Sequence, residues 1–98
     1  MDTNIVYRHR LEINTAQQTL SLSATHKLLY VGILNGELFL WIQVNACEKR
    51  VVRTIRVVGT GCNTVNPDWK YVGTAATVVS GCALECHVYV EPLEEKTE

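Results

Sequence analysis

The sequence predicts an all-β fold, a small antiparallel β-sandwich or barrel of about seven strands with an acidic C-terminal tail. Three observations predict it. Short apolar segments rich in β-branched residues recur along the chain, apolar and polar residues alternate within several of them, and Asn35-Gly36 joins two of them directly. No window combines a helical period with helix caps, although a short helical turn fits residues 66–71.

The first half of the chain contains four predicted strands. The first two alternate apolar with polar residues, which is the period of a half-buried strand. The next two form a hairpin, because Asn-Gly supplies the positive φ that both central residues of a type I′ turn require. In the last strand Phe39 and Trp41 lie opposite an equally apolar face, so we expect a central strand or an edge covered by a second subunit. The four strands span residues 6–13, 17–22, 26–34 and 37–44.

Three further strands are predicted in the second half, and the last two form a hairpin around Ser80-Gly81. Pro67 and Asp68 mark a loop before this hairpin. The residues after the last strand are acidic and begin at a proline, which is typical of a flexible tail. The strands span residues 50–58, 70–79 and 82–90, so that residues 1–91 form a single β domain and residues 92–98 a flexible acidic tail.

The composition of the 98-residue chain argues against several classes of protein. Nine basic and ten acidic residues give a net charge of −1, so binding to nucleic acid is not expected. The N-terminal segment lacks the cationic lead and apolar core of a secretory signal. No apolar run approaches the roughly 18 residues needed to cross a bilayer. We therefore expect a soluble, intracellular protein that does not bind membranes.

The four cysteines, Cys47, Cys62, Cys82 and Cys86, are expected to be reduced thiols that bind no metal. Cys82 and Cys86 are four residues apart on a predicted strand, which separates their alpha carbons by about 13 Å. A single zinc ion cannot bridge that distance with bonds of roughly 2.3 Å to sulfur. Neither a metal site nor a cofactor is expected.

The glycine-rich segment Gly59-Thr60-Gly61 is the best candidate for a binding site. It follows an apolar run, as phosphate-binding loops do, but it leads to another strand. It also lacks the third glycine of the dinucleotide motif and the Lys-Ser/Thr of a P-loop. Two interpretations follow: a bend where glycine permits a bulge or a positive φ, or a non-enzymatic anion site. The anion site would comprise Arg56, Gly59, Thr60, Gly61, Asn63 and Trp69.

No catalytic residues are predicted, and we expect the protein not to be an enzyme. His87 lies among core-like residues and is expected to be packed or hydrogen-bonded. No serine, cysteine or carboxylate is spaced in the sequence to pair with a histidine. A basic surface is a separate hypothesis, whose alternative is that the strand arginines form an ordinary solvated face. Arg8, Arg10, Arg50 and Arg56 share one parity within their strands, so they would form one basic face if those strands were neighbours.

The order of several motifs resembles a family of small phage-encoded proteins that consist of a single domain of unknown function. The motifs are YRHRLEI, LNGELFLWIQV, RTIRVVGTG, YVGT and HVYVEP, and they cover residues 7 to 92. Proteins of that family resemble one another in a GTGH motif. At the same place this chain has GTGC, with Cys62 instead of the histidine, so a function that depends on the loop histidine would be lost. The resemblance implies a phage or prophage origin and expression in the cytoplasm of a bacterial host. It implies no activity.

Two hypotheses of function follow. One is a non-enzymatic binding protein that counteracts host defence by sequestering a nucleotide-derived anionic small molecule at a subunit interface. The other is a structural or protein-interaction module, such as a phage accessory or assembly factor, with no small-molecule ligand. Under both we expect a homo-oligomer, a dimer or higher, because a small all-β domain exposes edge strands and residues 37–44 need cover on two faces.

Overall fold

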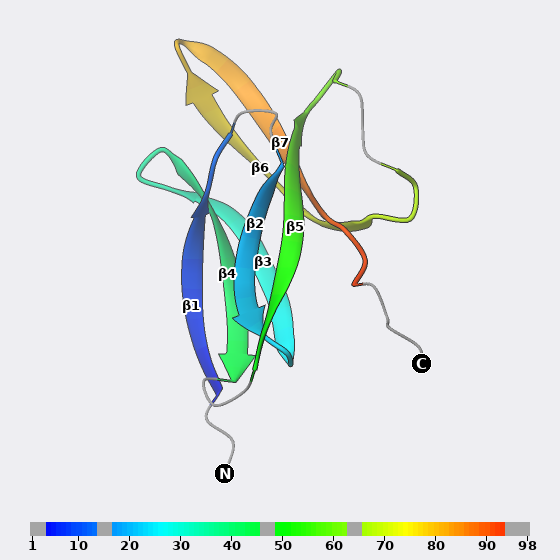
Figure 1. Cartoon of the computed structure of the whole chain (residues 1–98). Helices are drawn as coiled ribbons and strands as arrows, with labels where there is room; N and C mark the ends of the chain where they lie inside the picture. Colours follow the sequence, from blue (N-terminus) through cyan, green and yellow to red (C-terminus); the bar gives the residue numbers. More distant parts are fainter. Residues whose placement is uncertain (1–3, 14–16, 46–48, 63–65, 94–98) are drawn as a thin grey trace.

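The alternating segments form seven strands in the computed structural model, which describes residues 4–13, 17–45, 49–62 and 66–93 (Figure 1). The described ranges contain no helix, so none of them holds a helix long and apolar enough to span a membrane. The strands are β1 (Asn4–Leu11), β2 (Gln18–Ser23), β3 (His26–Leu34), β4 (Glu37–Asn45), β5 (Arg50–Gly59), β6 (Lys70–Val79) and β7 (Cys82–Val90). The prediction of an all-β fold is confirmed.

The strands form two sheets that pack face to face. The three-stranded sheet has the order β1-β4-β3, and the four-stranded sheet has the order β2-β5-β7-β6. Every pairing is antiparallel. The architecture is therefore the sandwich of the two predicted alternatives. The strand with two apolar faces, β4, is the central strand of its sheet, which is one of the two expected alternatives.

Both predicted hairpin turns have the backbone that their residues favour. Asn35 and Gly36 have φ values of 52° and 79°, and Ser80 and Gly81 have φ values of 52° and 80°. Positive φ at both central residues matches the right-handed twist of the flanking strands, which is why such turns close two-residue hairpins. Glycine adopts this conformation without the steric cost that a Cβ would add.

The core lies between the sheets and consists of the residues that strand alternation places on the inner faces. Along β4 every second side chain is buried, with at most 4% of its surface exposed. Full burial of one such aliphatic side chain contributes about 1.5–3 kcal/mol to stability. The central core residues are Leu38, Leu40, Ile42 and Val44 from β4, and Ile55, Val57, Cys86, Val88 and Val90 from the facing sheet.

The outer face of the three-stranded sheet carries an aromatic cluster, which we call the aromatic face (Arg8, Tyr30, Phe39 and Trp41). The ring centres of Tyr30 and Trp41 are 5.5 Å apart, and those of Phe39 and Trp41 are 6.0 Å apart. The guanidinium of Arg8 lies 5.2 Å from the centre of the Phe39 ring, within range of a cation–π contact. These contacts leave Phe39 and Trp41 half-buried.

The edge strands β3 and β6 approach each other on one side of the sandwich. A Cβ at Gly73 would lie 3.1 Å from both Cβ and Cγ2 of Val31, so only glycine allows this spacing. Both strands have a register shift next to the contact, between Leu28 and Tyr30 in β3 and between Tyr71 and Gly73 in β6. Bulges of this kind bend a strand. The bends bring the first residues of β3 and β6 to a common pocket, described below.

The predicted bounds of β3, β6 and β7 agree with the structure, and those of β1 are shifted by two residues. The side chain of Gln18 explains where β1 ends. Its Oε1 accepts a hydrogen bond from the Glu12 backbone N–H at 2.9 Å, and its Nε2 donates to the Glu12 carbonyl at 3.0 Å. These bonds satisfy the backbone of Glu12 without a strand partner, so the ladder stops at Leu11, which pairs with Leu38.

Two possibilities that the sequence left open are not realised. The arginines do not form one basic face, because Arg8 and Arg10 lie in the three-stranded sheet and Arg50 and Arg56 lie near opposite ends of β5. Residues 66–71 do not form a helical turn. They form a turn closed by a 3.0 Å hydrogen bond from the backbone N–H of Trp69 to the carbonyl of Asn66, followed directly by β6. Of the predicted tail, residues 94–98 lie outside the described residues.

Candidate functional site

The predicted Gly59-Thr60-Gly61 site is a tight turn at the end of β5. Gly61 has a φ of 91°, and the backbone N–H of Cys62 donates to the carbonyl of Gly59 at 3.1 Å. The positive φ agrees with the interpretation of this segment as a bend between strands. Asn63, the fifth residue of the predicted site, lies outside the described residues.

The hydrogen-bond donors of Thr60 and Cys62 in this turn are engaged within the chain. The backbone N–H of Thr60 donates to the carbonyl of Glu85 at 3.3 Å, and its hydroxyl donates to the carboxylate of Glu85 at 2.8 Å. An incoming anion would compete with Glu85 for these donors and would meet its negative charge. The turn is therefore poorly suited to binding a phosphate group, and the anion site predicted at this turn stays a prediction.

Thr60 also belongs to a chain of side-chain hydrogen bonds across the outer face of the four-stranded sheet. His87 Nε2 lies 2.7 Å from the hydroxyl of Thr60, and His87 Nδ1 lies 2.9 Å from the hydroxyl of Thr74, which also contacts the hydroxyl of Tyr71. Since an ionised carboxylate only accepts, the Thr60 proton goes to Glu85 and His87 Nε2–H donates to Thr60.

The directions of these hydrogen bonds decide whether His87 is placed to act as a general base. A histidine that acts as a general base must accept the proton of its nucleophile, whereas here His87 donates to Thr60. The hydroxyl of Thr74 then donates to Nδ1, so each polar hydrogen has an acceptor inside the chain. His87 is hydrogen-bonded, as the sequence led us to expect. Its two partners, Thr60 in the turn after β5 and Thr74 in β6, lie 27 and 13 residues away in the sequence, which is why no short spacing indicated them.

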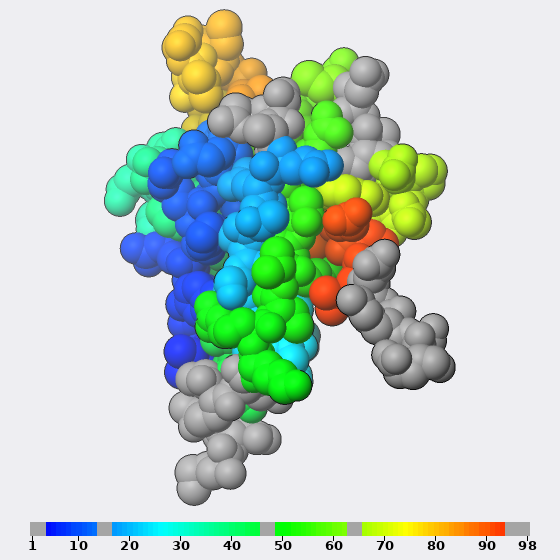
Figure 2. Space-filling view, in the orientation of Figure 1, coloured from blue at the N-terminus to red at the C-terminus, as the bar shows by residue number. Residues whose placement is uncertain are grey.

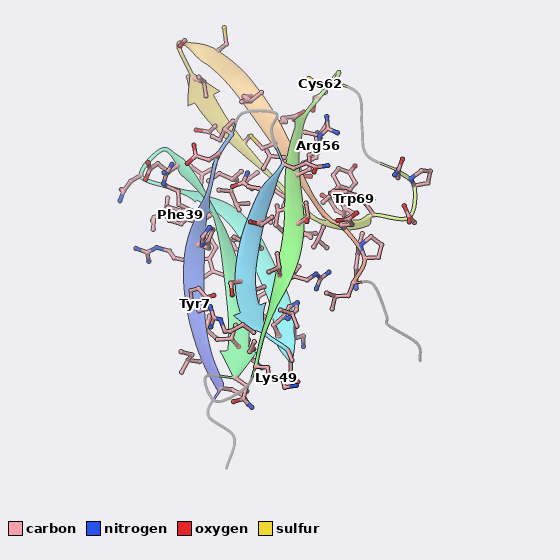
Figure 3. All side chains as sticks on the ribbon, viewed as in Figure 1. Tyr7, Phe39, Lys49, Arg56, Cys62 and Trp69 are labelled. Atoms are coloured by element: carbon pink, nitrogen blue, oxygen red, sulfur yellow. The ribbon has the colours of Figure 1, made fainter. Side chains whose placement is uncertain are left out.

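Arg56 and Trp69, the two large side chains of the predicted site, are both half-buried. Figure 3 shows Arg56 on β5 and Trp69 just before β6, both on the right-hand side of the view. Arg56 is opposite Tyr89 in the strand register, and its Nε is buried without a hydrogen-bond partner among the described residues. The ring of Tyr89 meets Tyr71 edge-on, with ring centres 5.7 Å apart.

A second and more basic site lies where β3 and β6 begin. It is a pocket of about 320 Å³, which we call the basic pocket. Three cationic side chains and a histidine contribute to its lining, and none of the described lining residues is a carboxylate. The lining residues are His26, Lys27, Leu28, Arg53, Lys70, Tyr71, Val72 and Val90.

Arg53 is the central group of the basic pocket. It lies on the same side of β5 as the core residues Ile55 and Val57, and it is half-buried. Its Nη1 donates to His26 Nε2 at 2.6 Å, and its Nη2 donates to the backbone carbonyl of Glu91 at 3.2 Å. Both partners are uncharged acceptors. Burial lowers the pKa of the Arg53 guanidinium from its ordinary value, yet an arginine remains cationic at neutral pH.

His26 orients Arg53 and is itself fixed by the backbone. The contact of 2.9 Å between His26 Nδ1 and the carbonyl of Ser23 requires a proton on Nδ1, which leaves Nε2 free to accept from Arg53. Ser23 is held in turn, because its hydroxyl accepts from the backbone N–H of Asn45 at 3.0 Å. The guanidinium is therefore positioned by two neutral groups on a rigid support.

The positive charge of the basic pocket is not neutralised by the described part of the chain. The ion pairs among the described residues join Arg10 to Glu12 and to Glu37, far from the pocket, and none involves Lys27, Arg53 or Lys70. A partly buried charge without a counter-ion is costly unless a ligand or solvent compensates it. The pocket is thus electrostatically suited to an anion.

A family model covers nearly the whole chain. It is described as "Domain of unknown function (DUF7352)" and matches residues 2–98. The chain belongs to this family. No curated protein and no solved structure matches the chain. The membership confirms the expected single-domain family of unknown function.

The residues of the basic pocket were not predicted as a site, although the sequence pattern marks one of them, Arg53, as unusual. Arg53 has the parity of Val51, Ile55 and Val57, so a charge stands on the core-facing side of an apolar strand. Lys27 and Lys70 each stand near the start of a strand and carry no such signal. Their proximity follows from the approach of β3 to β6, which depends on tertiary structure.

Proposed function

We propose that the protein binds a small anionic molecule without transforming it, and that the basic pocket is the binding site. The observation that carries the proposal is the half-buried Arg53 guanidinium, which has only neutral partners among the described residues. Lys27 and Lys70 add positive charge to the same pocket. The pocket supports this function better than the Gly59-Thr60-Gly61 turn does, because the Thr60 hydroxyl in that turn donates to the Glu85 carboxylate and the Thr60 N–H donates to the Glu85 carbonyl.

The expected ligand carries a phosphate group. The planar fork of a guanidinium matches phosphate oxygens, and lysine ammonium groups supply point charges beside it. A volume of about 320 Å³ lies at the lower end of the range for small-molecule sites, which suits one phosphorylated metabolite such as a mononucleotide. The sequence resembles a family of phage-encoded proteins. In such a protein, this binding would sequester a nucleotide-derived signal of host defence.

Isothermal titration calorimetry with inorganic phosphate and mononucleotides tests the proposal. Arg53→Met keeps the aliphatic part of the side chain and removes the charge. Loss of a charged hydrogen-bonding partner costs about 1.5–3 kcal/mol, which weakens binding by roughly 10- to 150-fold. The matched control is Arg50→Met on the same strand, because the Arg50 guanidinium bonds to Ser21 outside the pocket.

Two outcomes would contradict the proposal. One is that none of these anions binds to the wild-type protein. The other is that Arg53→Met and Arg50→Met weaken binding equally, which would indicate a non-specific electrostatic effect. A third variant, Arg56→Ala, separates the two candidate sites. It is silent if the ligand occupies the basic pocket, and it costs about 1.5–3 kcal/mol if the ligand contacts the turn after β5.

The aromatic face supports a second candidate function, a protein-interaction module. Tyr30 is 61% exposed although its ring packs at an angle against Trp41, so the face offers apolar surface beside the cation of Arg8. Tyrosine, tryptophan and arginine are the residues enriched at the centres of protein interfaces. This candidate differs in its consequences: Trp41→Ala or Phe39→Ala breaks the oligomer, while Arg53→Met and Arg56→Ala have no effect.

A further inference from the structure

Strand β6 forms one edge of the four-stranded sheet. Beyond its contact with β3 at Gly73, the described residues give this edge none of the features that keep edge strands apart. Exposed edges invite pairing with another chain, and proteins prevent it with charged side chains, proline, bulges, short strands or a covering element. Residues 71–79 contain no charged residue and no proline. The one bulge lies between Tyr71 and Gly73, so the strand is regular from Gly73 to Val79.

The other three sheet edges of the molecule are protected. Strand β1 carries the consecutive basic residues Arg8, His9 and Arg10. Strand β2 has only six residues. Strand β3 has Lys27 near its start and a bulge before Tyr30, and β6 approaches it at the contact of Val31 with Gly73. The contrast singles out β6 as the edge that is compatible with a partner.

The unprotected part of β6 belongs to a hairpin that extends beyond the rest of the sandwich. Figures 1 and 2 show the tip of β6 and β7 standing clear of the molecule at the top of the view. Val78 and Val79 are 66% and 45% exposed at this tip. Beneath it a cleft of about 490 Å³, which we call the hairpin cleft, separates the tip from β1 and β4. Its apolar walls are formed by Leu11, Ile13, Leu38, Val79 and Leu84.

We propose that β6 pairs antiparallel with β6 of a second copy of this chain, which makes a symmetric dimer with a continuous eight-stranded sheet. A two-fold axis through the strand places the same uncharged segment on both sides, so no like charges face each other. The same operation on β1 would set Arg8 and Arg10 against the partner's basic residues. The pairing satisfies the backbone groups of β6 that point away from β7.

Light scattering coupled to size-exclusion chromatography tests the dimer. The wild-type protein is expected at twice the chain mass of 11.0 kDa at micromolar concentration. The double variant Ala76→Lys and Val78→Lys places two charges on the exposed side of the edge, and it is expected at the mass of one chain. The control is Val52→Lys, which changes a valine of nearly equal exposure, 63%, on the central strand β5 and leaves the dimer intact.

Hydrogen exchange supplies a readout that needs no variant. The amides of residues 75–79 that point away from β7 are expected to exchange more slowly as the protein concentration rises, while those of β1 do not change. A wild-type protein that stays at the mass of one chain overturns the proposal. A dimer that persists in the double lysine variant also overturns it. The proposal fails as well if Trp41→Ala dissociates the dimer while hydrogen exchange in β6 stays independent of protein concentration. The dimer needs no ligand, so this test is independent of the basic pocket.

Discussion

Replacing Gly73 with alanine should destabilise the protein more than its small size suggests. The new Cβ would lie 3.1 Å from Cβ and Cγ2 of Val31, a buried residue that is 4% exposed. Valine is restricted at χ1, so it cannot turn both atoms away, and β3 and β6 must move apart. Overpacking of this kind costs about 1–3 kcal/mol. For a domain of this length the loss lowers the melting temperature by roughly 4–24 °C.

The assay is thermal and urea unfolding of Gly73→Ala beside a matched control, Gly59→Ala. At Gly59 the new Cβ would meet Leu84 Cδ1 at 3.4 Å and Cys62 Sγ at 3.6 Å, which are ordinary contacts. We therefore expect Gly59→Ala to change stability by less than about 1 kcal/mol. Val31→Ala should relieve part of the strain, so the double variant loses less than the sum of the single losses. Equal stability of the two alanine variants would refute the close contact of β3 and β6.

Two further predictions concern titratable groups. Cys62 and Cys82 are exposed and should react with a thiol reagent in the native protein. Cys86 is buried and burial raises the pKa of its thiol, so Cys86 should react only on unfolding. Rapid reaction of Cys86 in the native protein would contradict its place in the core. Burial, and then the charge of Arg10, lowers the pKa of His9 from 6.5, so the unfolded chain binds a proton first as the pH falls. Stability should therefore decline from pH 6.5 downward, less steeply in His9→Gln; identical urea midpoints of both proteins across this range would contradict it.

Much of the fold could be predicted because it depends on local signals. The alternation along the chain determines which side chains of each strand face the core, and the Asn35-Gly36 and Ser80-Gly81 turns impose their hairpins through positive φ. The order of strands within the sheets was not predicted. It depends on contacts between distant segments, such as β5 with β7 and β6 with β3. The supposed basic face of four arginines failed for this reason, because β1 and β5 belong to different sheets.

The candidate site was harder to predict than the fold. The Gly59-Thr60-Gly61 segment resembles part of a phosphate-binding loop in sequence. The carboxylate that accepts from the Thr60 hydroxyl belongs to Glu85, which lies 25 residues from Thr60 in the sequence. The basic pocket draws its residues from β3, β5, β6 and β7. Only Arg53, a cation on the inner side of an apolar strand, could have been recognised from the alternation.

A nuclear magnetic resonance titration with a mononucleotide tests the proposed function most directly, because it reports where an anion binds. The proposed function predicts that the backbone amides of residues 26–28, 53 and 70–72 shift in a saturable manner, and that those of residues 59–62 do not. Shifts centred on residues 59–62 would place the ligand at the turn after β5 instead. Shifts that remain linear in ligand concentration at all basic residues would contradict specific anion binding.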